Sequence, residues 1–231
     1  MRIEIWSDIV CPWCYIGKRR LETALAGFPH EVEVVWRSFQ LDPGSPVQAT
    51  ETVAEHLGRK YGGGREAGQR MIDNVEAVAA EEGLVYRLGE AKRVNTVDAH
   101  RLLHLAQSQG VQAELEEALF SAYFTQAADV GDHEVLRRLG VEVGLEPDRV
   151  DATLDSDEFR DAVYADIEQA QAYGATGVPF FVIDAKYGIS GAQPADVFTQ
   201  VLEQAWADSH PTLQMTPSSG EGACGPDGCA V

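Results

Sequence analysis

A Cys-x-x-Cys motif at the junction of a predicted strand and a predicted helix constrains this chain more than any other feature. Residues 2–6 alternate polar and apolar side chains, which is the period of a β-strand. From Cys11 onward, small and apolar residues recur at helical spacing until Gly27-Phe28-Pro29 ends the pattern. Residues 30–39 are rich in β-branched and aromatic side chains and predict a second strand. The chain therefore begins as a β-α-β unit, with Cys11-Pro12-Trp13-Cys14 where strand meets helix.

The rest of the chain predicts a helical insert and then the second half of an α/β domain. Apolar stripes at helical spacing run through residues 45–154. One more helix ends near Tyr173-Gly174, and residues 177–191 read as a β-hairpin before a last helix that begins at Pro194. We expect a β-α-β…α-β-β-α domain formed by residues 1–44 and 155–207. A helical insertion domain would occupy residues 45–154, and a flexible tail residues 208–231.

The composition excludes several classes of function. The 231 residues contain 18 Lys plus Arg against 37 Asp plus Glu, a formal charge of −19 that repels phosphate backbones and anionic lipid. We therefore expect no nucleic-acid partner and no membrane attachment. Glu4 and Asp8 interrupt the only candidate signal peptide, so we expect a cytoplasmic protein. The six histidines show no metal-ligand spacing, and we expect no bound metal.

The position of the motif favours thiol–disulfide chemistry. Cys11 would lie at a helix N-terminus, where unpaired N–H groups and the helix dipole favour thiolate over thiol. We expect Cys11 to be the exposed nucleophile and Cys14, one turn further on, to resolve the mixed disulfide. Pro12 suits the first helical turn and, with Trp13, should tune the redox poise. Asp8 would oppose a negative charge nearby.

A second cysteine pair, Cys224 and Cys229, stands near the other end of the chain. It brackets Gly-Pro-Asp-Gly, a turn signal that could bring the two Cα atoms within disulfide range. We hypothesise that this pair exchanges disulfides with Cys11–Cys14 as a shuttle or latch, since the preceding segment gives it reach. A labile disulfide without function, or two free thiols, are the alternatives. For the first pair the alternatives are zinc ligation and inert packing, which the unmatched spacing of the two pairs makes less favourable.

Pro179 is the second informative position. It opens the predicted third strand directly after Gly177-Val178, and an X-Pro bond is the one at which the cis isomer costs little. The topology brings the start of this strand to the N-terminus of the first helix. A cis bond would turn the backbone of Val178 toward Cys11 and offer its N–H and C=O to an extended peptide or to glutathione.

Taken together, these segments resemble the DsbA-type branch of the thioredoxin superfamily and, more narrowly, the FrnE-type cytoplasmic disulfide oxidoreductases. The resemblance extends from residue 2 to residue 206 and rests on residues 8–17, 36–43, 95–96, 99–101, 122–124, 177–183 and 191–193. It implies a thioredoxin fold interrupted by a helical domain, thiol–disulfide exchange through Cys11, and a cis-proline loop opposite the motif. The substrates it implies are proteins with disulfides or thiols. No bound cofactor is implied, and glutathione or a reductase would serve as redox partner.

Two related classes keep an alternative open. The 2-hydroxychromene-2-carboxylate isomerases and the kappa-class glutathione transferases share this pattern but typically have serine where Cys11 stands. Both cysteines are present here, which favours redox chemistry over a glutathione-dependent isomerase acting on a small aromatic or polyketide. A role in lining a substrate cleft is the alternative for four further polar residues, but we expect each to form a surface salt bridge or a satisfied core contact instead: Arg37, Asn95, His100 and Arg101.

Overall fold

A four-stranded mixed sheet forms the centre of the protein, in a computed structural model that describes residues 1–46 and 51–211. The strands are β1 (Arg2–Ser7), β2 (Glu33–Ser38), β3 (Phe180–Ile183) and β4 (Tyr187–Ser190). Their order is β2-β1-β3-β4, with β1 and β2 parallel and the other neighbours antiparallel. The central strand β1 pairs Ile5 with Trp36 on one side and with Phe181 on the other.

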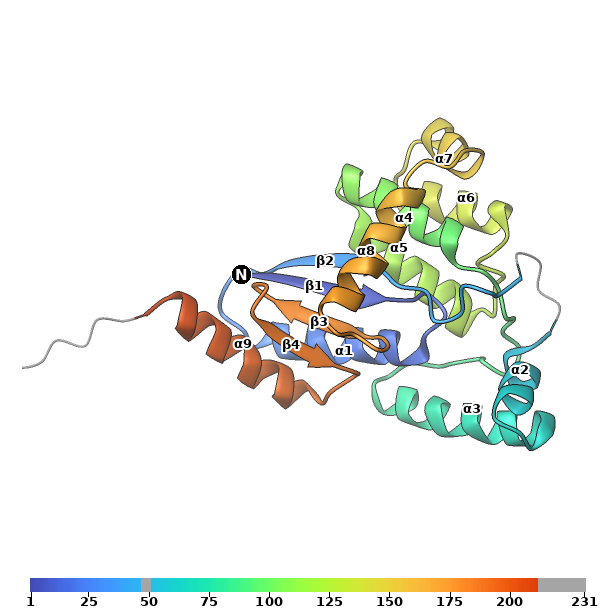
Figure 1. Cartoon of the computed structure of the whole chain (residues 1–231), viewed down its shortest axis with the longest axis horizontal. Helices are drawn as coiled ribbons and strands as arrows, with labels where there is room; N and C mark the ends of the chain where they lie inside the picture. The colour runs from blue at the N-terminus through green and yellow to red at the C-terminus, as the bar shows by residue number, and fades with distance from the viewer. Residues whose placement is uncertain (47–50, 212–231) are drawn as a thin grey trace, which may run out of the picture.

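Helices cover both faces of the sheet (Figure 1). On one face, α1 (Pro12–Ala26) and α9 (Ala195–Ser209) pack together, and their apolar residues share a core with Ile3 and Ile5 of β1. On the other face, Trp6 is buried with Ala170 of α8 (Arg160–Ala172), and its indole N–H donates to the Asp166 carbonyl at 2.7 Å. The alternation of β1 side chains therefore supplies both cores, which is why this strand can be central. The α/β class and the β-α-β…α-β-β-α order are confirmed.

The helical insert forms two groups beside the C-terminal end of β1 (Figure 1). One is a hairpin of α2 (Val53–Lys60) and α3 (Gly64–Glu81). The other group packs against β2 and α8; it contains α4 (Val97–Gln109), α5 (Gln112–Phe120), a π-helical turn at Ser121–Thr125, α6 (His133–Glu142) and α7 (Pro147–Leu154). Because α8 packs against α4, the two halves share contacts, and the domain division stays a prediction.

Glycine allows the backbones of α2 and α3 to touch. A Cβ atom on Gly68 would lie 2.0 Å from the Ala54 carbonyl oxygen, and one on Gly58 would lie 2.0 Å from that of Gly64. No side chain fits at either position, so this helix packing requires glycine at both. This close packing fixes α3 against α2 and shapes the cavity described below.

Within the described ranges, no helix is long and apolar enough to cross a membrane. In the same ranges, no group of three or more His, Cys, Asp or Glu side chains is placed to hold a metal ion. Cys224 and Cys229 lie outside the described residues.

Candidate active site

The Cys-x-x-Cys motif lies at the junction of β1 and α1. Cys11 is the N-cap residue of α1, with extended backbone angles, and Pro12 is the first helical residue. The Cys11 amide donates to the Asp8 carbonyl at 2.9 Å, and the Cys14 amide donates to the Cys11 carbonyl at 3.0 Å. These two bonds close the turn and bring both thiols to the same end of the helix. The positive end of the helix dipole therefore acts on Cys11.

The loop before β3 lies directly against Cys11. The Val178–Pro179 peptide is cis. The Cys11 thiol donates to the Val178 carbonyl oxygen at 3.5 Å, so the backbone of Val178 does turn toward the motif. Gly17 of α1 admits this loop, because a Cβ there would lie 3.1 Å from Pro179 Cγ and 3.2 Å from Phe181 Cζ.

The expectation that Cys11 is exposed is wrong for this structure. Cys11 is 2% exposed and Cys14 is 1% exposed, whereas Trp13 between them is 42% exposed. Cys11 lies beneath the Val178 loop on one side, and on the other side the Tyr86 hydroxyl donates to the Pro12 carbonyl at 2.8 Å. Sequence position predicts a helix N-terminus but not what the insert places over it.

Cys14 is held as a thiol by its surroundings. Burial raises the pKa of Cys14 well above its usual value, and the hydrogen bond and charge of Cys11 raise it further. The Asp8 backbone and the Ser7 side chain act in the opposite direction through hydrogen bonds. Cys14 must therefore lose a proton before it can resolve a mixed disulfide.

A buried glutamate from the insert is hydrogen-bonded to Ser7, the last residue of β1 before the motif. The Ser7 hydroxyl, which lowers the pKa of Cys14, donates to Glu116 Oε1 at 3.0 Å. Glu116 on α5 is 1% exposed, and its Oε2 has no hydrogen-bond partner among the described residues. Burial raises the pKa of Glu116 to about 8, with Ser7 and Lys18 opposing the shift. Ser7 thus stands between Cys14 and a buried carboxyl group whose pKa is about 8.

Sequence reasoning missed Ser7 and Glu116. Ser7 is the last residue of β1, and Glu116 lies 109 positions further on. Consecutive glutamates at 116 and 117 on a helix with an apolar stripe were the only local signal, because one of them had to lie near the apolar face. Such a signal shows that a carboxyl is buried but not where it points.

Asp8 and His100 form a second buried pair beside the motif. Asp8 is 1% exposed, and its Oδ2 accepts from the Leu41 amide at 2.7 Å. His100 Nε2 lies 3.6 Å from Asp8 Oδ1, yet neither ring nitrogen of His100 has a hydrogen-bond partner in the described parts of the chain. His100 therefore has the carboxylate neighbour expected of a salt bridge but no hydrogen bond within the described residues. The tuning role of Asp8 stays a prediction.

The other three polar residues have structural partners, as expected. Arg37 donates to Glu4 and Asp166, which ties β2 to β1 and α8. Arg101 is 1% exposed and donates to three backbone carbonyls in and after α7, among them that of Glu158 at 2.7 Å. Asn95 bonds to the loop at residues 43–45.

The family profile described as DSBA-like thioredoxin domain matches residues 2–203. This chain belongs to the DSBA-like thioredoxin family. A solved structure described as a probable DsbA oxidoreductase from Streptomyces coelicolor is 49% identical, with a TM-score of 0.86, and the match covers 100% of this chain and 99% of that one. The family resemblance is thereby confirmed, and the FrnE-type resemblance is consistent with it.

More distant DsbA-like structures share the fold alone. A 2-hydroxychromene-2-carboxylate isomerase is 12% identical with a TM-score of 0.67, and the match covers 90% of this chain and 98% of that one. The cytosolic disulfide reductase DsbM from Pseudomonas aeruginosa, solved with GSH, is 18% identical with a TM-score of 0.63, and the match covers 89% and 99% of the two chains. Family and relatives together make this chain a thiol–disulfide oxidoreductase in general terms.

Proposed function

We propose that this DSBA-like protein is a cytoplasmic protein-disulfide reductase or isomerase that uses Cys11 as nucleophile and Cys14 as resolving thiol. The observation that carries the proposal is the position of Cys11. It caps α1, stands one turn from a second thiol and faces the Val178 carbonyl at 3.5 Å. Pro12 and Trp13 form the turn between the thiols, and the exposed Trp13 is available to an approaching substrate chain.

The reaction proceeds in two exchanges. The Cys11 thiolate attacks one sulfur of a substrate disulfide, a Cys11–substrate disulfide forms, and the other substrate sulfur leaves as a thiolate. Cys14 then gives up its proton through Ser7 to ionised Glu116 and attacks the Cys11 sulfur, and the second substrate sulfur leaves as a thiolate that takes a proton from solvent. The substrate gains two electrons and the cysteine pair loses two. Because the pKa of Glu116 is about 8, its carboxyl is mostly protonated at pH 7 and becomes a better base as the pH approaches 8.

Val178 and Pro179 would position the substrate chain. A backbone carbonyl and amide beside the nucleophile can pair with an extended peptide as one strand pairs with another. In a reducing cytosol the pair would be returned to the dithiol by glutathione or by a reductase, which makes reduction or isomerisation the favoured direction. Exchange with Cys224 and Cys229 stays a prediction; unchanged turnover and redox potential in a Cys224→Ser/Cys229→Ser double variant would contradict it.

Insulin reduction by the full-length protein with glutathione as reductant tests the proposal. The wild type should reduce insulin, Cys11→Ser should lose the activity, and Cys14→Ser should accumulate a mixed disulfide. If Cys14→Ser instead retains full turnover of a glutathione-dependent reaction on a small aromatic, the isomerase alternative is correct.

A further inference from the structure

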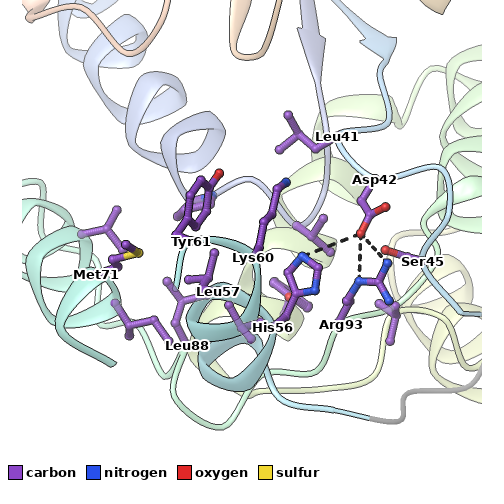
Figure 2. Close-up of a pocket in the computed structure, with 17 residues that line it drawn as sticks. Leu41, Asp42, Ser45, His56, Leu57, Lys60, Tyr61, Met71, Leu88 and Arg93 are labelled. Carbon is purple, nitrogen blue, oxygen red and sulfur yellow. Dashed lines mark hydrogen bonds and ion pairs between the residues drawn. The ribbon is translucent and has the colours of Figure 1, made fainter. Parts of the chain in front are cut away.

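A cavity of about 280 Å³ lies beside the active-site turn, between the α2–α3 hairpin and the loop after β2 (Figure 2). Val10 and Pro12, the two chain neighbours of Cys11, line it on the sheet side. The hairpin contributes the apolar side chains of Leu57, Met71 and Val75. The cavity is therefore built from the insert and the redox motif together, and an occupant would touch the residues on both sides of the nucleophile.

Most charged groups in this cavity already have partners. Arg93 donates to Asp42 at 2.8 Å, and His56 lies 4.0 Å from the same carboxylate. Lys60 differs from them. It is the only one of the four lysines with no carboxylate within 4.0 Å among residues 1–46 and 51–211.

The ammonium of Lys60 lies at an apolar opening. It is 5.6 Å from the centre of the Tyr61 ring, and Lys60 extends from the last residue of α2 toward Leu41 (Figure 2). Tyr61, Met71 and Leu41 are exposed although they are large and apolar. Exposed apolar side chains gathered at one cavity indicate a binding surface, and an ammonium among them that has no carboxylate partner in the described ranges selects a negative group.

We infer that this cavity binds a small apolar molecule with one carboxylate, and that the protein accordingly reduces low-molecular-weight disulfides of this kind. The second half of the inference rests on the proposed function. The volume lies near the lower limit for ligand pockets, which suits a one- or two-ring acid better than a peptide. The rings would contact the α2–α3 hairpin, and the carboxylate would pair with Lys60.

The redox step on such a disulfide balances with the dithiol alone. The Cys11 thiolate attacks one sulfur, the S–S bond breaks, and one arylthiolate leaves. Cys14, once deprotonated, attacks the Cys11 sulfur and releases the second arylthiol. Each substrate disulfide takes two electrons from the protein, and the Cys11–Cys14 disulfide forms.

The cavity is tested first with a probe that has no sulfur. Titration of the full-length protein with naphthoate should give saturable binding, and naphthylmethanol should bind more weakly because it lacks the carboxylate. Lys60→Ala should weaken naphthoate binding about fivefold, the upper end for an accessible ion pair, and leave the alcohol unchanged. Lys186→Ala, which removes the same charge at the β3–β4 turn, should change neither. Absence of saturable naphthoate binding, or equal affinity in Lys60→Ala, would overturn the inference.

The substrate class is tested with two aryl disulfides in the Cys224→Ser/Cys229→Ser background, so that only Cys11 and Cys14 react. Lys60→Ala should slow the reduced protein about fivefold with dithiobis(nitrobenzoate) and leave its rate with uncharged dithiodipyridine unchanged. Equal rates for wild type and variant with the first reagent would overturn the substrate class. Failure of the proposed function has a different signature, because the cysteines would then not exchange with glutathione while naphthoate still bound.

Discussion

Replacing Glu116 by glutamine should remove a pH dependence of stability that the fold creates. Burial raises the pKa of Glu116 from 4.5 to about 8. Between these values the unfolded chain has lost the proton that the folded chain keeps, so stability falls as the pH rises through this window. At 1.36 kcal/mol per pKa unit, the free energy of unfolding falls by about 2 to 3 kcal/mol between pH 5 and pH 7 because of this group. Glutamine cannot ionise, so the variant does not lose stability in this way as the pH rises.

The assay is urea unfolding of wild type and Glu116→Gln at several values between pH 5 and pH 8. The variant should gain stability relative to wild type by about 2 to 3 kcal/mol on going from pH 5 to pH 7. Glu117→Gln is a matched control with the opposite sign. Lys18, Tyr15 and Arg19 lower the pKa of Glu117 against the effect of burial, so its contribution is present at neutral pH and lost in acid. Parallel pH curves for wild type and Glu116→Gln would refute the reasoning.

Three further predictions concern the motif, the hairpin and the insert. Cys14→Ser should trap a glutathione adduct on Cys11, which mass spectrometry of the intact protein detects and which dithiothreitol removes. Gly68→Ala should cost about 3 kcal/mol in urea unfolding, because the new Cβ meets the Ala54 carbonyl at 2.0 Å, and it should also abolish naphthoate binding. Arg101→Met should cost about 3 kcal/mol or more in urea unfolding, because it leaves buried carbonyls without donors; an unchanged midpoint would contradict this.

The parts of the fold with local sequence signals were predictable. The alternation of residues 2–6 gives β1, and Pro12 after Cys11 gives the first turn of α1. Pro179 after Gly177-Val178 predicts the loop that faces the motif, because the strand order places the start of β3 beside the N-terminus of α1. Each of these features depends on neighbours within a few residues or on the order of strands.

The site features that were missed depend on contacts between distant segments. Glu116 reaches Ser7 only because α5 packs against β2, and no local pattern records that contact. The surroundings of the buried motif include Tyr86, which bonds to Pro12, and Val178, which bonds to Cys11, and these two residues come from distant parts of the sequence. The lack of a carboxylate near Lys60 in the part of the chain that the structure describes was unpredictable for the same reason, since sequence alone does not show which carboxylates approach a lysine.

The redox equilibrium of Cys11 and Cys14 with glutathione tests the central claim most directly. Full-length protein with Cys224→Ser and Cys229→Ser would be equilibrated at graded ratios of reduced to oxidised glutathione. Its free thiols would then be alkylated and the mass of the intact protein measured by mass spectrometry. The account predicts a reversible two-electron couple, with a Cys11–Cys14 disulfide that forms and disappears with the ratio and is absent in Cys11→Ser. Thiols that stay unreacted at every ratio, or that bind zinc tightly instead, would contradict it.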